Sequence, residues 1–412
     1  MITDWWCDMA KFSMWLPPFS PDYSGAVSVL FDLKTVTAMH DASGCTGNYT
    51  GYDEARWYGS KSAVFCSGLR SIDAILGNDD KLIKKMKAAA KDIEPDILAL
   101  IGSPVPMVIG ADLKGIAAQL EEETGIPSFG FDTTGTAYYD RGAFAAAKAL
   151  LNRFAVRDPE GRKPKRVNIL GALPMDFGQG KDIGNLKELL KEKGYHTGLC
   201  LAMGYSLDDL KHAPEASVNL AVSRFGWLTA RFMEQKFGIP YLCGFPAGEK
   251  GEKDWLEALE TVEQSGKSRY LWQEENGADQ EEDPKNSVLI IGEQVMADSI
   301  RHALKKDRLA GSVTVGCLYG LQKELGRPGD LDLTEERRIR DAVRDEKYKR
   351  IIGDPFLRLL PEIKKRPAGT LVPFSQYAVS SKLGQADAAC MEGKHLEKWW
   401  KKQNMKQEEK TE

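Results

Sequence analysis

The chain has 412 residues and a net charge of −4, with 42% hydrophobic and 28% charged residues. This length is enough for two or three domains with cores of their own, and the composition is that of an ordinary soluble globular protein. The charge gives no basic field to attract nucleic acid or anionic lipid, which argues against a protein that binds nucleic acid or a membrane surface.

Features of export and membrane insertion are missing from the sequence. The N-terminal segment has early acidic residues and no uninterrupted apolar core, so we expect no signal peptide. No stretch approaches the roughly 18 apolar residues that a membrane helix needs. The seven cysteines are widely spread without a CxxC pair, which favours reduced thiols or metal ligands over disulfides. We therefore expect a cytoplasmic protein.

In the first part of the chain, a short apolar strand, a turn and an amphipathic helix recur. Residues 97–101 form an unbroken apolar run, which is typical of a strand buried on both faces of a parallel sheet. Apolar residues at helical spacing predict one helix at 82–93 and another at 111–123. Gly125 and Pro127 end the second helix.

The same pattern starts again twice. After a polar linker at 157–164, the predicted strands are 167–170, a segment near Leu199, 218–222 and 240–243, and the predicted helices are 185–193 and 227–237. An acidic linker at 273–286 precedes the strand 287–292, a helix through Lys306 and the strand 313–317. Three such series predict an α/β protein of three doubly wound Rossmann-like lobes with mainly parallel sheets. We divide them at 1–160, 161–275 and 286–395, followed by a charged, frayed tail at 396–412.

Two loops of the first lobe combine a cysteine with glycine and small hydroxyl residues. The first, at 40–49, contains His40, Gly44 and Cys45, and the second, at 62–68, contains Cys66, Ser67 and Gly68. Backbone N–H groups of such loops hydrogen-bond bound anions or the sulfides of a cluster. A four-iron cluster takes about four thiolates, so a chain with two would supply half a site and a symmetric dimer would complete it. On spacing alone, isolated cysteines are more often small buried hydrophobic residues.

Several motifs in order along the chain resemble component 1 of the nitrogenase family, in which a Gly-Cys loop and a second cysteine precede a helix start. The matching segments are Gly44-Cys45, Cys66 with residues 72–77, and residues 94–97, 108–113, 206–220, 237–241 and 288–294. The likeness extends from about Pro17 to Leu383. It implies the three-lobed fold and an oxidoreductase whose Cys45 and Cys66 ligate an iron–sulfur cluster, close to Gly44, Ser67 and Gly68.

The resemblance also implies partners. A separate dimeric ATPase with its own iron–sulfur cluster would dock and deliver electrons, so that ATP is used by the partner protein. This chain would form a homodimer, or a heterodimer with a paralogous subunit. Its nearest match to a P-loop, residues 261–268, lacks the first glycine and continues a helix, so we interpret it as a helix end.

Two departures from the family limit what is carried over. The family's third bridging cysteine falls near Pro104, and the cysteine that anchors the nitrogenase cofactor falls near Ser223. Proline does not ligate metals and serine is a poor substitute for a thiolate. We therefore expect a smaller cluster, most simply [4Fe-4S] shared between two subunits, and no reduction of dinitrogen.

Other candidates and alternatives stay open. His40 is a candidate proton donor or hydrogen-bond donor to the cluster, or a structural histidine, and Cys243 is a candidate for contact with substrate, whereas Cys200 and Cys317 are expected core residues. Asp53, Arg56 and Trp57 shape the dimer surface, contact a ligand or simply pack. Cys7 and Cys390 are incidental, and the loop 171–176 has no catalytic signature. The alternatives are a scaffold for metallocofactor assembly, a metal-free binding protein, and a zinc site of His40, Cys45 and Cys66.

Overall fold

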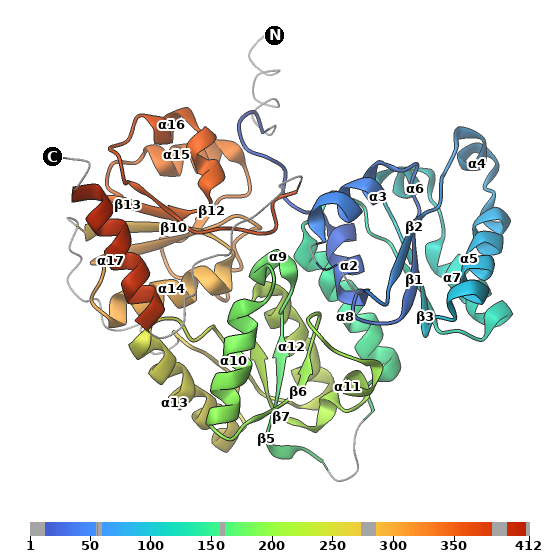
Figure 1. The fold of residues 1–412 in the computed structure, drawn as a ribbon, viewed down its shortest axis with the longest axis horizontal. Coiled ribbons are helices and arrows are strands. Elements are labelled where there is room, and N and C mark those ends of the chain that lie inside the picture. Colours follow the sequence, from blue (N-terminus) through green and yellow to red (C-terminus); the bar gives the residue numbers. More distant parts are fainter. Residues whose placement is uncertain are drawn as a thin grey trace.

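A computed structural model of the chain describes residues 13–54, 56, 60–156, 161–272, 286–380 and 394–408. Three parallel sheets, each covered by helices, make up three lobes (Figure 1). The predicted α/β class with mainly parallel sheets is therefore confirmed.

The first sheet has the strand order β2-β1-β3-β4 and is parallel throughout. Its strands are β1 (Thr35–Met39), β2 (Ala63–Cys66), β3 (Ile97–Ile101) and β4 (Ser128–Phe131). The helical elements of this part are α2 (Asp22–Leu30), α3 (Gly44–Asn48), the π-helical turn η1 (Tyr49–Asp53), α4 (Ser71–Leu76), α5 (Asp79–Ile93), α6 (Pro104–Ile109), α7 (Leu113–Thr124) and α8 (Tyr139–Phe154). Strands β1 and β3 are fully buried; the continuous apolar sequence of β3 predicts this, whereas β1 contains two buried threonines, Thr35 and Thr37.

The second sheet has the order β6-β5-β7-β8-β9. Its strands are β5 (Lys163–Leu170), β6 (His196–Cys200), β7 (Ala216–Ala221), β8 (Tyr241–Cys243) and β9 (Arg269–Tyr270). The helices are α9 (Pro174–Phe177), α10 (Lys181–Glu192), α11 (Leu207–Lys211), the 3-10 turn η2 (Ala213–Glu215), α12 (Arg224–Phe237) and α13 (Glu249–Ser265). Helix α13 ends at Gly266 in a left-handed conformation, so residues 261–265 are a helix end and not a phosphate-binding loop.

The third sheet has the order β12-β11-β10-β13-β14. Its strands are β10 (Val288–Gly292), β11 (Val313–Cys317), β12 (Leu331–Asp332), β13 (Arg350–Gly353) and β14 (Leu371–Pro373). The helices are α14 (Gln294–Lys306), α15 (Glu336–Arg344), the 3-10 turn η5 (Pro355–Leu359), α16 (Pro361–Lys364) and α17 (Lys394–Glu408). Among the residues described, none forms a helix with the length and apolar character needed to cross a bilayer.

One predicted boundary differs from the structure. The predicted linker at 157–164 is shorter, because β5 already begins at Lys163, and residues 157–160 lie outside the described part. The acidic segment 273–285 is also outside it.

The tail was wrongly expected to be frayed. Helix α17 packs against α13, and its Leu396 and Trp400 are 0% and 3% exposed. The ring of Trp399 lies edge-on to Phe374 with centroids 6.5 Å apart. Leu396, Trp399 and Trp400 stand at the i, i+3, i+4 spacing of one helix face. The many charged residues around them nevertheless led to the expectation of a frayed tail.

The lobes are connected by more than the chain between them. Helix α8 packs against α2 on one side and α12 on the other, and so lies between the first and second sheets (Figure 1). Near the end of the third lobe, residues 378–380 return to the first: Ser20 N–H donates to the Ala378 carbonyl at 3.0 Å, and Phe19 forms a β-bridge with Val379.

Candidate functional site

Both predicted cysteine ligands lie at the carboxyl-terminal edge of the first sheet. Cys66 is the last residue of β2 and stands opposite Met39, the last residue of β1. Cys45 lies in α3, which follows β1 after a short turn, and both cysteine side chains are partly buried. Because β1 and β2 are neighbouring parallel strands, the loops that follow them meet at one edge of the sheet.

Asp41 connects the two cysteine loops. The Cys66 Sγ donates to the main-chain oxygen of Asp41 at 3.3 Å, and the Asp41 carboxylate accepts from the N–H of Thr46, the neighbour of Cys45, at 3.0 Å. The N–H of Gly68 donates to Cys66 Sγ at 3.3 Å from a residue with a φ of 67°, which glycine adopts without strain. The Cys66 sulfur thus already accepts a backbone hydrogen bond, which is also how proteins tune cluster sulfurs.

The environment of Cys45 favours the protonated thiol. Burial raises the pKa of Cys45 and the charge of Asp41 adds to this, whereas hydrogen bonds with Tyr23 and Ser103 oppose it. A metal ion would therefore have to displace a proton on binding. Gly44, the residue before Cys45, is exposed, and an added Cβ there would meet no atom within 4 Å.

His40 lies between the second cysteine loop and a small cavity. Its Nδ1 is 3.0 Å from the Ser67 hydroxyl, and burial lowers the pKa of His40. The imidazole also lines a cavity of about 210 Å³ together with residues of α4 and α5. Lys85 lines the same cavity, and its Nζ donates to the Ser67 carbonyl at 2.6 Å. The structure thus holds His40 in a hydrogen bond with the Cys66 loop.

A group of exposed apolar side chains lies along the same edge of the sheet. They come from the end of β2, from α4 just after the Cys66 loop, and from α6 just after β3. We call this group the apolar rim; its members are Phe65, Ile72, Ile75, Leu76, Val105, Met107, Val108 and Ile109. Val108 is 86% and Ile75 77% exposed. Exposed apolar side chains gathered on neighbouring elements favour a site of contact with other molecules.

The described residues contain no group of three or more His, Cys, Asp or Glu side chains that could hold a metal ion. The zinc site of His40, Cys45 and Cys66 is therefore not formed. Pro104, at the position of the family's third cysteine, is the first residue of α6, where its missing N–H costs nothing. Within the described part, one chain offers two thiols at this edge.

The other cysteine candidate is sealed inside the protein. Cys243 ends β8 and is 0% exposed, and burial raises its pKa well above the usual range. It is therefore a core residue in this structure and does not line an open surface. Cys200 and Cys317 are also buried, as expected. Cys7 and Cys390 lie outside the described residues.

The charged segment after the first cysteine loop packs within the protein. Asp53 accepts hydrogen bonds from Ser24 at 2.6 Å and Ser380 at 2.9 Å. Arg56 forms an ion pair with Glu54 at 2.8 Å and donates to a carbonyl of the second lobe, that of Ala202, at 2.7 Å. Both side chains therefore bind other parts of this chain, and Trp57 is outside the described residues.

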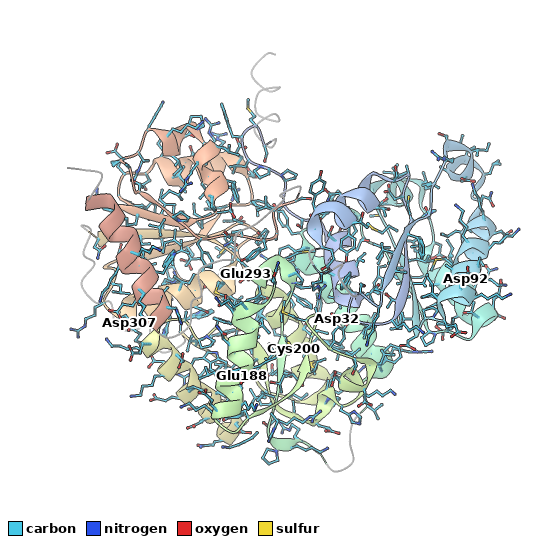
Figure 2. The ribbon with its side chains drawn as sticks, in the orientation of Figure 1. Asp32, Asp92, Glu188, Cys200, Glu293 and Asp307 are labelled. Atoms are coloured by element: carbon cyan, nitrogen blue, oxygen red, sulfur yellow. The ribbon has the colours of Figure 1, made fainter. Side chains whose placement is uncertain are left out.

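Sequence reasoning missed a buried polar cluster where the three lobes meet. Arg224, at the start of α12, donates from its side chain to Asp140 of α8 at 2.7 Å and to the Gly320 carbonyl of the third lobe. Its main-chain N–H donates to Glu293 at 2.8 Å. Glu293 caps α14 and lies in the middle of the molecule (Figure 2). Each of these residues is polar and sits at a helix start, but only the fold brings them together.

Asp176 belongs to the same cluster. Its carboxyl group accepts a hydrogen bond from the Tyr139 hydroxyl, and burial together with the charge of Glu293 raises its pKa well above the usual range. Ser223, at the position of the family's cofactor cysteine, caps α12 through Gly226 N–H at 3.3 Å and donates to the Gly171 carbonyl at 2.9 Å. Its hydroxyl therefore has a structural role. The loop 171–176 is thus mostly apolar and buried, and it contributes one carboxyl group, that of Asp176, to this cluster.

Comparison with known proteins places this arrangement in a family. One of the subunits of the light-independent protochlorophyllide reductase of Chloroflexus aggregans is 28% identical over 191 residues, which cover 45% of this chain and 34% of that protein. The nitrogenase iron-molybdenum cofactor biosynthesis protein NifE of Clostridium pasteurianum is 25% identical over 350 residues, 81% of this chain and 74% of that protein. The chain thus spans about a third of the reductase protein and most of NifE.

A solved structure supports the fold. A structure of nitrogenase Cp1 at pH 5 superposes with a TM-score of 0.65 over 89% of this chain and 85% of that chain, at 17% identity. The family model described as nitrogenase component 1 type oxidoreductase matches residues 21–304, most of the 412. This chain therefore belongs to the nitrogenase component 1 type oxidoreductase family.

Proposed function

We propose that this chain is the electron-accepting subunit of a nitrogenase-like oxidoreductase. In this proposal Cys45 and Cys66 contribute two of the four thiolates of a [4Fe-4S] cluster, and a second subunit, identical or paralogous, contributes the rest. When bound, the cluster would supply a site that stores one electron at a time. A separate ATP-dependent iron–sulfur reductase would deliver electrons, and the complex would work in the cytoplasm.

One observation carries the proposal: two partly buried cysteines end up on adjacent loops, next to exposed apolar surface. Buried cysteines that only fill a core, such as Cys243, have no such surface beside them. The apolar rim would be covered by the second subunit, whose approach would also shield the sulfurs from water. Gly68 and the other backbone donors of the loops would hydrogen-bond to the ligand sulfurs.

The chemistry of the donor set fits a cluster in this position. Cys45 and Cys66 supply sulfur donors, which iron prefers, and the Cys45 thiol, whose pKa burial raises, would release its proton when a metal binds. His40 and Ser67 form a hydrogen bond immediately behind the Cys66 loop and would orient it. The substrate is not named by any of these residues. The lack of a cofactor-type cysteine at Ser223 argues against dinitrogen.

The test is anaerobic purification followed by iron analysis of the native chain and of three variants. We expect a brown protein with about four irons per dimer. Cys45→Ala and Cys66→Ala should each lose most of this iron, whereas Cys200→Ala, which removes a buried thiol far from the loops, should keep it. A folded, dimeric protein that stays colourless after reconstitution with iron and sulfide would refute the proposal and favour the metal-free alternative.

A scaffold for metallocofactor assembly is the second candidate, and the long match to NifE favours it. The two candidates differ in what happens to the iron. An oxidoreductase keeps its cluster through many turnovers and needs ATP and the reductase to act. A scaffold passes its metal to an apo-acceptor protein and loses it in the process. Iron counted before and after incubation with each partner separates them.

A further inference from the structure

A basic hollow lies in the third lobe, remote from the cysteine loops. Residues 337–366 contain eleven Lys or Arg and five Asp or Glu, in a chain whose net charge is −4. Four of these cations line a cavity of about 500 Å³, a size within the range of about 300–1,000 Å³ for small-molecule sites. They are Lys349, Arg350, Lys365 and Arg366, and they share the cavity with Asn286, Thr370, Pro367 and one carboxylate, Glu346.

The fold places this hollow at the amino-terminal edge of the third sheet. Arg350 is the first residue of β13, and Thr370 directly precedes β14. Lys365 and Arg366 directly follow α16. Glu293, which belongs to the buried polar cluster where the three lobes meet, lies at the opposite, carboxyl-terminal edge of the same sheet. The hollow is therefore separate from that polar cluster and from the cysteine loops.

Backbone carbonyls hold both arginines in place, and the Asp345 carboxylate also interacts electrostatically with Arg366, whereas no carboxylate does so with Arg350. Arg366 donates from Nη1 to the Asp345 carbonyl at 3.1 Å and from Nη2 to the Tyr348 carbonyl. Arg350 donates from Nη1 to the Gly369 carbonyl at 2.8 Å. Backbone carbonyls orient a guanidinium but leave its net charge. In the described part of the chain, neither arginine has a carboxylate partner within 4 Å.

Other desolvated arginines of this protein have such a partner. Arg56, Arg224 and Arg301 each face a carboxylate, which raises their pKa. Burial lowers the pKa of Arg350, and no carboxylate offsets it. Lys349 and Lys365 likewise form no ion pair among the residues that the structure describes. A desolvated guanidinium beside two unpaired lysines is an arrangement that an anion would stabilise.

We propose that this hollow binds a small phosphate-bearing anion. Arginine recognises phosphate oxygens through paired N–H donors, and lysine adds positive charge. Within the part of the chain that the structure describes, Arg350 uses only Nη1 in a hydrogen bond with the protein, so its Nε and Nη2 donors can serve an anion, whereas Arg366 contributes mainly its positive charge. The exposed lysines at the rim would close on the anion from the solvent side.

The test uses the full-length protein and inorganic pyrophosphate, titrated calorimetrically at low ionic strength. We expect saturable binding that weakens as salt is added, since the attraction is between charges. The double variant Lys349→Gln with Lys365→Gln should bind at least about tenfold more weakly. These side chains are exposed, so folding should be unaffected. The matched control is Lys84→Gln with Lys91→Gln on the exposed face of α5, which changes the net charge equally and should bind like the native chain.

Two outcomes would overturn the proposal. The first is no saturable binding of pyrophosphate to the native protein. The second is an equal loss of affinity in the control variant, which would show a general charge effect. Orthophosphate and adenosine triphosphate, titrated in parallel, report the size of anion that fits.

Discussion

Arg224 is the side chain whose loss we expect to destabilise the protein most. It is 3% exposed and its partner Asp140 is 1% exposed, so water does not reach the pair. The guanidinium donates to one Asp140 oxygen from Nε at 3.0 Å and from Nη2 at 2.7 Å. The variant Arg224→Met keeps most of the volume but leaves the buried Asp140 carboxylate to the more distant and exposed Arg141, 3.9 Å away. Breaking a buried pair in this way costs about 3–5 kcal/mol.

The size of the shift in melting temperature follows from the chain length. An unfolding entropy of roughly 2.1 cal/mol/K per residue gives about 0.9 kcal/mol/K for this chain when it melts as one unit. Arg224→Met should therefore melt about 3–6 °C below the native protein. Differential scanning calorimetry measures this shift. We choose pH 8 because Asp140 then stays ionised, so protonation does not reduce the cost of burying its charge.

Two further variants make the result interpretable. Arg153→Met removes an exposed partner of Glu121, a pair 2.6 Å apart, and should change the melting temperature by no more than about 1 °C. Adding Asp140→Asn to Arg224→Met removes the unpaired charge and should recover part of the loss. A melting temperature of Arg224→Met within 1 °C of native, or a double variant no better than the single one, would refute the reasoning.

Three shorter predictions follow. Ile75→Asp and Val108→Asp, in the apolar rim, should each raise the dissociation constant of the dimer at least about tenfold in sedimentation equilibrium, whereas Val156→Asp, exposed elsewhere, should not. An unchanged dissociation constant would exclude this surface as the interface. Burial raises the pKa of Asp298 to about 7, so the stability that its protonated form contributes is complete below about pH 4 and is lost as the pH rises through 7. Asp298→Asn should therefore flatten the fall in melting temperature between pH 5 and 8. Native and variant proteins whose melting temperatures fall in parallel over this range would contradict the prediction. Leu396→Ala should cost about 2–5 kcal/mol in urea unfolding, and a loss below about 0.5 kcal/mol would show that α17 does not stabilise the fold.

The sequence by itself determined the class of fold and the position of the cysteine loops. Strands such as β3 and β10 are apolar at every position because parallel strands are covered on both faces, and this signal is local. Cys45 and Cys66 follow the first two strands of a parallel sheet, so their meeting at one edge follows from strand order. The motifs of the first lobe also pointed to the family that the comparison then established.

Only the tertiary structure decided which polar residues are brought together and which cysteines are sealed. Cys243 and Cys66 both end strands, yet Cys243 is fully buried and Cys66 is not, because β8 is inside its sheet and β2 is at an edge. The contact of Arg224 with Asp140 joins segments 84 residues apart. The docking of α17 on α13 likewise depends on a distant surface. Such contacts depend on how separate segments pack, a property that no local pattern of residues carries.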